Sequence, residues 1–203
     1  MRRIAVVAAL LLCTACGSKQ KVLPPAPGRE DMPAAVGGTP RPGETVHEYD
    51  LNHDGHPDVW SYTVSGADGK EVVARKEKDL NNDGKIDSWE ENGPGGTVAK
   101  LTYDMDFDGK PDVTLYFEKD QLVRKDYAFG FDGVPHSSNY YEKNKLVRKE
   151  RDGNGDGKVD TWEYWENGEV DRVGVDLDGD GQVDRWETRK TAPAPEGAAA
   201  PKR

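Results

Sequence analysis

The sequence predicts an all-β protein built from tandem repeats that form an antiparallel β-meander. A nine-residue acidic motif, Asp-x-(Asp/Asn)-x-Asp-Gly-x-x-Asp, occurs five times, and the later repeats keep a spacing of 24 residues. The copies start at Asp50, Asp79, Asp104, Asp152 and Asp176. Short runs rich in aromatic and β-branched residues lie between them, which favours strands. No segment shows the 3.6-residue periodicity of an amphipathic helix.

Each repeat is expected to contain an acidic loop, a strand, a two-residue turn and a return strand. Turns are predicted at Lys119-Asp120, Lys143-Asn144 and Asn167-Gly168, because Gly, Asn and Asp tolerate the positive φ of a type I′ turn. This register pairs an aromatic with an aliphatic residue in each hairpin: Trp165 with Val170, Tyr141 with Leu146 and Phe117 with Leu122. Continued without interruption, the same register pairs Tyr164 with Asp171, Glu163 with Arg172, Tyr140 with Val147 and Tyr116 with Val123.

Two-residue turns make neighbouring strands antiparallel, so a parallel β-solenoid is disfavoured. We expect about ten to twelve short strands, with the acidic loops along one edge and the tight turns along the other. The pattern leaves open whether the sheet stays open or forms a sandwich, a barrel or a propeller. Hydrophobic residues make up only 34% of the chain, which predicts a thin core.

The chain is expected to divide into four segments. Residues 1–15 are predicted to be a signal peptide, in which Arg2 and Arg3 precede an apolar run too short to span a bilayer. Residues 16–44 are rich in Pro and Gly and are expected to form a flexible linker. The repeat domain is placed at 45–188, and residues 189–203 are expected to be a disordered tail.

The segment Cys13-Thr14-Ala15-Cys16-Gly17 resembles the lipobox of bacterial lipoproteins. The resemblance implies cleavage before Cys16, a lipid anchor on Cys16 and delivery to the outer membrane. The alternative is ordinary secretion with an unmodified Cys16. The chain has two cysteines and both lie in this leader, so neither a disulfide nor a cysteine metal site is expected in the repeat domain.

The five loops are predicted to bind about five Ca²⁺ ions as structural cofactors, because oxygen ligands at alternate positions before a glycine turn suit this hard cation. The candidate ligands at loop positions 1, 3, 5 and 9 are Asp50, Asn52, Asp54, Asp58, Asp79, Asn81, Asp83, Asp87, Asp104, Asp106, Asp108, Asp112, Asp152, Asn154, Asp156, Asp160, Asp176, Asp178, Asp180 and Asp184. A sixth, degenerate copy starts at Ala128 and is expected to bind nothing. The alternative is that the loops are Asx-turns, in which Asp and Gly serve the turn geometry alone.

These loops resemble EF-hand calcium loops. They resemble more closely the calcium loops of FG-GAP repeats in integrin-type propellers, since strands rather than helices flank them. The EF-hand resemblance implies further ligands at the twelfth position, where Glu90, Glu163 and Glu187 stand. The FG-GAP resemblance implies direct ligation by the ninth residue and needs no such glutamate, so the role of the three glutamates stays open.

Three further sets of residues each allow two interpretations. The basic column of Arg75, Lys100, Arg124, Arg148 and Arg172 either binds an anionic polymer or lipid head groups, or is a strand face paired with nearby acids. The tryptophan column of Trp60, Trp89, Trp162 and Trp186 either stacks on sugars or fills the core. The histidines His47, His53 and His56 either bind Zn²⁺ or Cu²⁺ or are exposed polar residues.

The function predicted is that of a monomeric, lipid-anchored, calcium-binding module of the cell envelope. Its partners are expected to be the membrane, through Cys16, and an unknown envelope protein or glycan, and the acidic loops argue against nucleic acid. No nucleophile elbow or HExxH pattern occurs, so the chain is not expected to be an enzyme. One alternative is an interaction or immunity-type protein, because residues 162–168 resemble repeats of some bacterial antitoxin-like proteins. A second alternative is an envelope enzyme that depends on carboxylates.

Overall fold

A computed structural model describes residues 37–128 and 133–188 of the chain. The predicted signal peptide, Cys16, most of the predicted linker and the predicted tail lie outside the described residues. The described part contains twelve strands: β1 (Thr45–Tyr49), β2 (Val59–Ser65), β3 (Glu71–Lys78), β4 (Ser88–Asn92), β5 (Val98–Tyr103), β6 (Val113–Glu118), β7 (Gln121–Tyr127), β8 (Ser137–Glu142), β9 (Lys145–Arg151), β10 (Thr161–Glu166), β11 (Glu169–Val175) and β12 (Arg185–Thr188).

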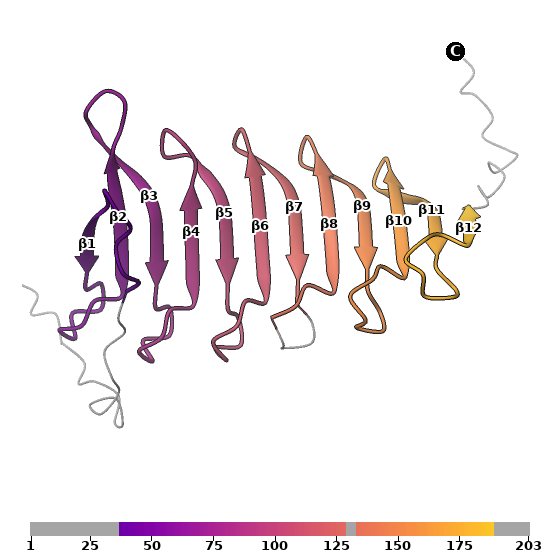
Figure 1. Cartoon of the computed structure of the whole chain (residues 1–203), viewed down its shortest axis with the longest axis horizontal. Coiled ribbons are helices and arrows are strands. Elements are labelled where there is room, and N and C mark those ends of the chain that lie inside the picture. The colour runs from indigo at the N-terminus through magenta and orange to yellow at the C-terminus, as the bar shows by residue number, and fades with distance from the viewer. Residues whose placement is uncertain (1–36, 129–132, 189–203) are drawn as a thin grey trace, which may run out of the picture. The chain divides into compact units, whose positions relative to one another are not determined.

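The strands form one open antiparallel sheet, in which their spatial order follows their order along the chain from β1 to β12. Figure 1 shows the tight turns along one edge of this sheet and the longer acidic loops along the other. The predicted all-β meander is therefore confirmed, and the question of sheet closure is settled in favour of the open sheet. No helix within residues 37–128 and 133–188 has the length and hydrophobicity needed to span a bilayer.

The hairpin turns have the predicted conformation. Lys119 and Asp120 have φ values of 50° and 61°, and Asn167 and Gly168 have values of 53° and 83°. Both central residues are thus left-handed, as a type I′ turn requires. The pairs next to the turns are also confirmed: Trp165 faces Val170, Tyr141 faces Leu146 and Phe117 faces Leu122.

Beyond the first two pairs, the predicted register is wrong, because each hairpin contains a β-bulge. Tyr164 faces Arg172 rather than Asp171, and Glu163 faces Val173 rather than Arg172. The same shift places Tyr140 against Arg148 and Tyr116 against Arg124. A bulge sets two residues of one strand against one of the other, so every pair below it moves by one position.

The bulges bring alternating tyrosines and arginines onto one face of the sheet, which we call the Tyr–Arg face. Side chains two residues apart in a strand share a face, and the register then aligns this row across neighbouring strands. The row contains Tyr62, Arg75, Glu91, Lys100, Tyr116, Arg124, Tyr140, Arg148, Tyr164 and Arg172. The basic column therefore alternates with tyrosines along the Tyr–Arg face, except that Glu91 lies between Arg75 and Lys100.

The apolar core is small and lies near the start of the sheet. Within the described residues, the buried hydrophobic side chains are Trp60, Tyr62 and Ala128. Val46 and Ile86 pack against Trp60 and Tyr62. The tryptophan column is thus core at Trp60, whereas Trp186 is 49% exposed.

Residues 37–44, which were expected to belong to the linker, pack on the Tyr–Arg face at this core. The backbone N–H of Gly38 donates to Glu77 at 2.5 Å, and the Tyr62 hydroxyl donates to the carbonyl oxygen of Gly38 at 2.6 Å. Arg75 donates to the carbonyl oxygen of Thr39 at 3.1 Å and forms an ion pair with Glu44 at 3.1 Å. Residues 37–44 therefore contact the repeat sheet, although they lie before the predicted domain boundary at residue 45.

Candidate metal centres

The acidic loops are tied to the sheet and to one another by backbone hydrogen bonds. In the first loop the N–H of Asp58, the ninth residue, donates to the carbonyl oxygen of Tyr49 at 2.8 Å. The N–H of Asp79, the first residue of the second loop, donates in turn to the carbonyl oxygen of Asp58 at 2.9 Å. Corresponding bonds join Asp87 to Asp104 and Asp160 to Asp176. Each loop thus holds the next one at a fixed position along the sheet edge.

Inside each loop, backbone N–H groups hold the carboxylates in a repeated arrangement. The two carboxylate oxygens of Asp50 accept hydrogen bonds from His53 at 2.7 Å and Gly55 at 2.9 Å. One oxygen of Asp58 accepts from Leu51 at 2.7 Å and Asn52 at 3.1 Å. The first and ninth residues of the other four loops accept equivalent bonds from their own loop backbone. The Asp residues therefore shape the loop, as the Asx-turn alternative requires. The carboxylate oxygens that accept no backbone hydrogen bond are the ones available to a metal ion.

The loop shape depends on left-handed residues at two positions. Gly157, the sixth residue of the fourth loop, has a φ of 86°, and the fourth residue of the first loop, His53, has a φ of 63°. Glycine adopts this conformation without the steric cost that a Cβ atom brings. His53 therefore occupies a turn position whose backbone N–H binds Asp50, rather than a position that the motif assigns to a ligand.

The third residue of each loop distinguishes two kinds of loop. In the first loop the amide nitrogen of Asn52 donates to Asp54 and Asp58, both at 3.1 Å. Asn154 makes the same pair of bonds in the fourth loop. An amide N–H thus lies between two carboxylates where the calcium prediction places the ion. Rotation of this amide would present its oxygen instead, because the two ends of an Asn side chain are similar in shape.

The third and fifth loops have Asp at this position and gather carboxylates closely. Oxygens of Asp104, Asp106 and Asp108 lie within 4.8 Å of one another, as do oxygens of Asp176, Asp178 and Asp184. The pKa of Asp106 is raised, first by desolvation and then by neighbouring carboxylates such as Asp108. Desolvation also acts on Asp176, but the N–H groups of Gly181 and Gly179 outweigh it and lower the pKa of Asp176.

The second loop contains the most buried carboxylate of the set. Asp87 is 1% exposed, and its Oδ2 accepts hydrogen bonds from Leu80 at 2.8 Å and Asn81 at 3.3 Å. Its Oδ1 is buried and has no hydrogen-bond partner among the described residues. Burial raises the pKa of Asp87, and the negative charges of Asp79 and Asp83 raise it further. A buried carboxylate oxygen without a partner is costly, so this atom would be satisfied by a cation.

The three glutamates at the twelfth position lie in strands and contact neighbouring side chains of the sheet. Glu90 in β4 binds Lys76 at 3.0 Å, and Glu187 in β12 binds Arg185 at 2.8 Å. Glu163 in β10 accepts a hydrogen bond from the indole of Trp165 at 3.1 Å. These contacts favour the arrangement in which the ninth residue, rather than the twelfth, completes each loop.

Two other predicted features can be placed. His47 lies in β1 and contacts Thr63 at 3.2 Å and Glu71 at 3.4 Å, away from the first loop. In the degenerate repeat, Ala128 donates to the carbonyl oxygen of Asp112 at 2.8 Å, and His136 donates to that of Tyr127 at 2.8 Å. This repeat keeps the backbone bonds of the others, although residues 129–132 lie outside the described part.

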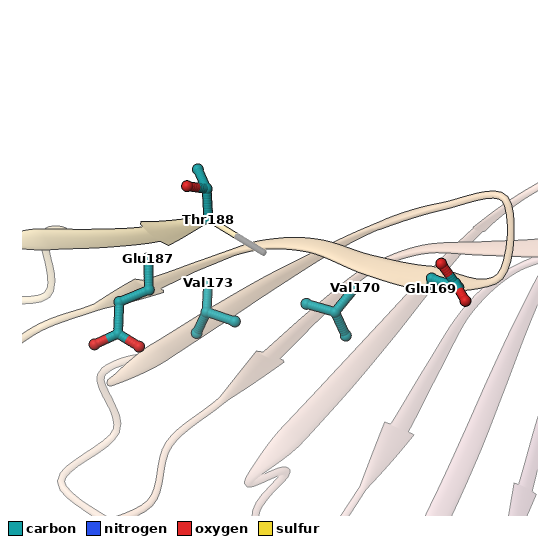
Figure 2. A pocket seen from close by; sticks show the side chains of 5 residues that line it. All are labelled: Glu169, Val170, Val173, Glu187 and Thr188. Atoms are coloured by element: carbon teal, nitrogen blue, oxygen red, sulfur yellow. The ribbon is translucent and has the colours of Figure 1, made fainter. Parts of the chain in front are cut away.

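A shallow hollow of about 520 Å³ lies between β11 and β12 and is lined by Glu169, Val170, Val173, Glu187 and Thr188. Figure 2 shows Val170, Val173 and Glu187 pointing to the same side of the ribbon. Val173 alternates with Arg172, so this hollow is on the face opposite the Tyr–Arg face.

No protein family and no curated protein matches the chain. Among solved structures, the GtfA/B complex matches with 16% identity and a TM-score of 0.35, over 57% of this chain and 19% of that one. A TarM mutant from S. aureus, solved with fondaparinux, alpha-GlcNAc-glycerol and UDP, matches with 9% identity and a TM-score of 0.32, over 64% and 21% of the two chains. A Glycosylation Associate Protein complex from Streptococcus agalactiae matches with 15% identity and a TM-score of 0.29, over 67% and 19%.

This chain spans about a fifth of the length of each matched chain. The expectation that the protein is not an enzyme is corrected by these matches, since one matched protein was solved with UDP and another is associated with glycosylation. The exclusion of enzymatic activity is therefore withdrawn. TM-scores of this size assign no activity to the chain.

The cluster of Tyr62, Arg75 and Glu77 beneath residues 37–44 was not predicted from the sequence. Its signal was present, because a tyrosine recurs four residues after the last loop residue and an arginine recurs four residues before the next loop. Only the bulge, which shifts the register by one residue, shows that these two columns face each other.

Proposed function

We propose that the chain is an exported, lipid-anchored, calcium-binding β-repeat protein that acts as a binding or structural module of the cell envelope. Calcium is its structural cofactor, held by the first, third, fifth and ninth residues of the five acidic loops. The carboxylate and amide oxygens of these residues are the hard ligands that Ca²⁺ prefers.

The calcium proposal rests on the buried carboxylate of Asp87. This carboxylate is 1% exposed and one of its oxygens has no hydrogen-bond partner in the described residues, while Asp79 and Asp83 add negative charge nearby. Turn geometry alone accounts for the bonds that Asp87 accepts from Leu80 and Asn81. It gives no reason to bury a second, unpaired oxygen, whereas a divalent cation does.

Calcium bound in the loops would also stabilise the sheet, which has few buried hydrophobic residues in its described part. A ligand at ten times its dissociation constant stabilises the folded state by about 1.4 kcal/mol. Five such sites would add roughly 7 kcal/mol, which is comparable to the total stability of an ordinary domain. Ion binding would then supply the stabilisation free energy that the small apolar core does not.

The test is calorimetric titration of the chelator-stripped, unlipidated chain with Ca²⁺, read beside far-ultraviolet circular dichroism. We expect saturation near five ions and a gain of β signal or of melting temperature. Mg²⁺ is the matched control, since it demands a smaller octahedral site and dehydrates reluctantly. If no heat of binding is measured and the melting temperature is unchanged, the calcium proposal is refuted and the loops are Asx-turns.

The membrane part of the proposal rests on the lipobox resemblance at Cys16. Expression with a labelled fatty acid should place label on the wild-type chain and on a Cys13→Ala variant, but not on Cys16→Ala. Equal labelling of the two variants, or none in the wild type, would refute the anchor without affecting the calcium proposal.

A further inference from the structure

Residues 37–44 pack on the Tyr–Arg face of β2 and β3 in the way that a separate peptide ligand would. Gly37 lies on the indole of Trp60, where an added Cβ would come within 2.4 Å of the ring. Gly38 exchanges hydrogen bonds with Glu77 and Tyr62, and Arg75 binds the Thr39 carbonyl oxygen and the Glu44 carboxylate. The ligand of this site is therefore a short segment with a turn at Pro42-Gly43, which offers the Thr39 carbonyl oxygen and the Glu44 carboxylate to an arginine stacked on a tyrosine.

A tyrosine, an arginine and a carboxylate in the same relation recur twice on β6 to β9. Arg124 stacks on Tyr116 with its guanidinium carbon 4.4 Å from the ring centre, and it donates to Asp126 in its own strand. Arg148 stacks on Tyr140 at 4.1 Å and pairs with Glu150 in its own strand at 3.3 Å. These sets repeat the relation of Arg75 to Tyr62 and Glu77, so the sheet presents two further copies of the site that binds residues 37–44.

The two copies differ from the first in charge and exposure. Arg75 pairs with two carboxylates, Glu44 and Glu77, and its side chain is 7% exposed. Among the described residues, Arg124 and Arg148 each pair with one carboxylate, and their side chains are 41% and 35% exposed. Each guanidinium has five N–H donors in a planar fork that suits carboxylates. Each copy therefore lacks the second carboxylate that covers Arg75.

We propose that the Tyr–Arg face of β6 to β9 binds an extended acidic peptide segment of a partner protein, with one carboxylate on Arg124 and one on Arg148. These arginines lie two strands apart, a distance of about 10 Å. Side chains on one face of an extended chain are two residues and about 6.6 Å apart, so the segment carries two acidic residues two positions apart, whose side chains span the remaining distance. The proposal goes beyond the calcium function and rests on the sheet face alone.

The test uses fluorescence anisotropy with the full chain and a short labelled peptide that carries two glutamates two positions apart among glycines and threonines. We expect saturable binding that weakens about tenfold when one arginine is removed, as the loss of a charge-assisted hydrogen bond predicts. The variants are Arg124→Gln and Arg148→Gln. A peptide with glutamine in place of both glutamates should bind at least tenfold more weakly.

Lys125→Gln and Lys149→Gln are the matched controls, because these lysines lie in the same strands on the opposite face and carry the same charge. They should leave peptide binding unchanged. Equal losses from the lysine and arginine variants would reveal non-specific electrostatic attraction and overturn the proposal, as would the absence of saturable binding. Stronger binding of a sulfated polysaccharide than of the peptide would overturn it in favour of a glycan.

Two further measurements keep the outcome clear. Tyr140→Phe removes only a hydroxyl, which donates to Glu150 at 2.8 Å, so it should retain the fold and the stacking and bind the peptide within about twofold of wild type if the arginine carries the affinity. The titration is run in calcium and in chelator, with circular dichroism as a check on the sheet. Peptide binding by a folded sheet in both conditions, without calcium uptake, would separate this inference from the calcium proposal.

Discussion

The guanidinium carbon of Arg75 lies 3.3 Å from the centre of the Tyr62 ring, and both residues are buried. Glu77 contacts both side chains, and Glu44 closes the cluster from the segment that covers it. Two carboxylates, one guanidinium and one phenol thus occupy the place where most domains have aliphatic side chains. Buried polar clusters of this kind make stability sensitive to pH.

The first prediction concerns alkaline pH. Burial and the negative charge of Glu77 raise the pKa of Tyr62 from 10.0 to about 12. Because the folded-state pKa lies above the unfolded one, the stabilisation is complete below pH 10.0 and is lost as the pH rises toward about 12. We expect a loss on the order of 2 kcal/mol in the free energy of urea unfolding over this interval, and Tyr62→Phe should remove the tyrosine part of it.

A second prediction concerns acid. Desolvation opposes ionisation of Glu44, but hydrogen bonds from Arg75 and Arg41 outweigh it and hold its pKa below the ordinary value of 4.5. The stabilisation from Glu44 is therefore present above pH 4.5 and is lost as the pH falls through the lowered folded-state pKa. Unfolding free energies of wild type and Glu44→Gln should converge below that pKa. The exposed Glu142→Gln variant should follow wild type, and a constant offset between Glu44→Gln and wild type would contradict the assignment.

The third prediction separates the two roles of Asp87. Asp87→Asn removes a buried negative charge, so in chelator we expect the variant to unfold at the same temperature as wild type or a higher one. In calcium it should be less stable than wild type by about 1.4 kcal/mol, the value of one site at tenfold its dissociation constant. Calorimetry should count one ion fewer. The control is Asp68→Asn in the β2–β3 hairpin, where the carboxylate is 59% exposed and pairs with Lys70.

The fourth prediction tests the loop backbone. Gly157→Ala meets no atom within 4 Å, so its cost comes from the φ of 86° alone. We expect a loss of about 1–2 kcal/mol in unfolding free energy, the penalty of placing a Cβ in the left-handed region. Gly93→Ala, where φ lies outside that region and contacts are at least 3.8 Å, should cost less. Equal losses would show that side-chain space rather than backbone conformation decides the result.

The sequence predicted those parts of the fold that short-range chemistry determines. The turn at Asn167-Gly168 and the pair Trp165–Val170 follow from residues that lie next to each other in the chain. The shift that sets Tyr164 against Arg172 could not be predicted, because a bulge at Asp171 changes the register without any Gly or Pro to mark it. The candidate ligands were identified by position, but burial of Asp87 depends on long-range packing that the repeat pattern does not encode.

Backbone hydrogen bonds join each loop to the next, so the sheet is expected to unfold from one end toward the other. Every strand pairs only with its neighbours in sequence, so the molecule behaves as a linear array in which order propagates from one repeat to the next. The buried cluster lies at β2 and β3, whereas all four residues of β12 are exposed. Thermal fraying should therefore start at β12 and advance toward β2. Amide protons of β2 and β3 should be the last to exchange with solvent.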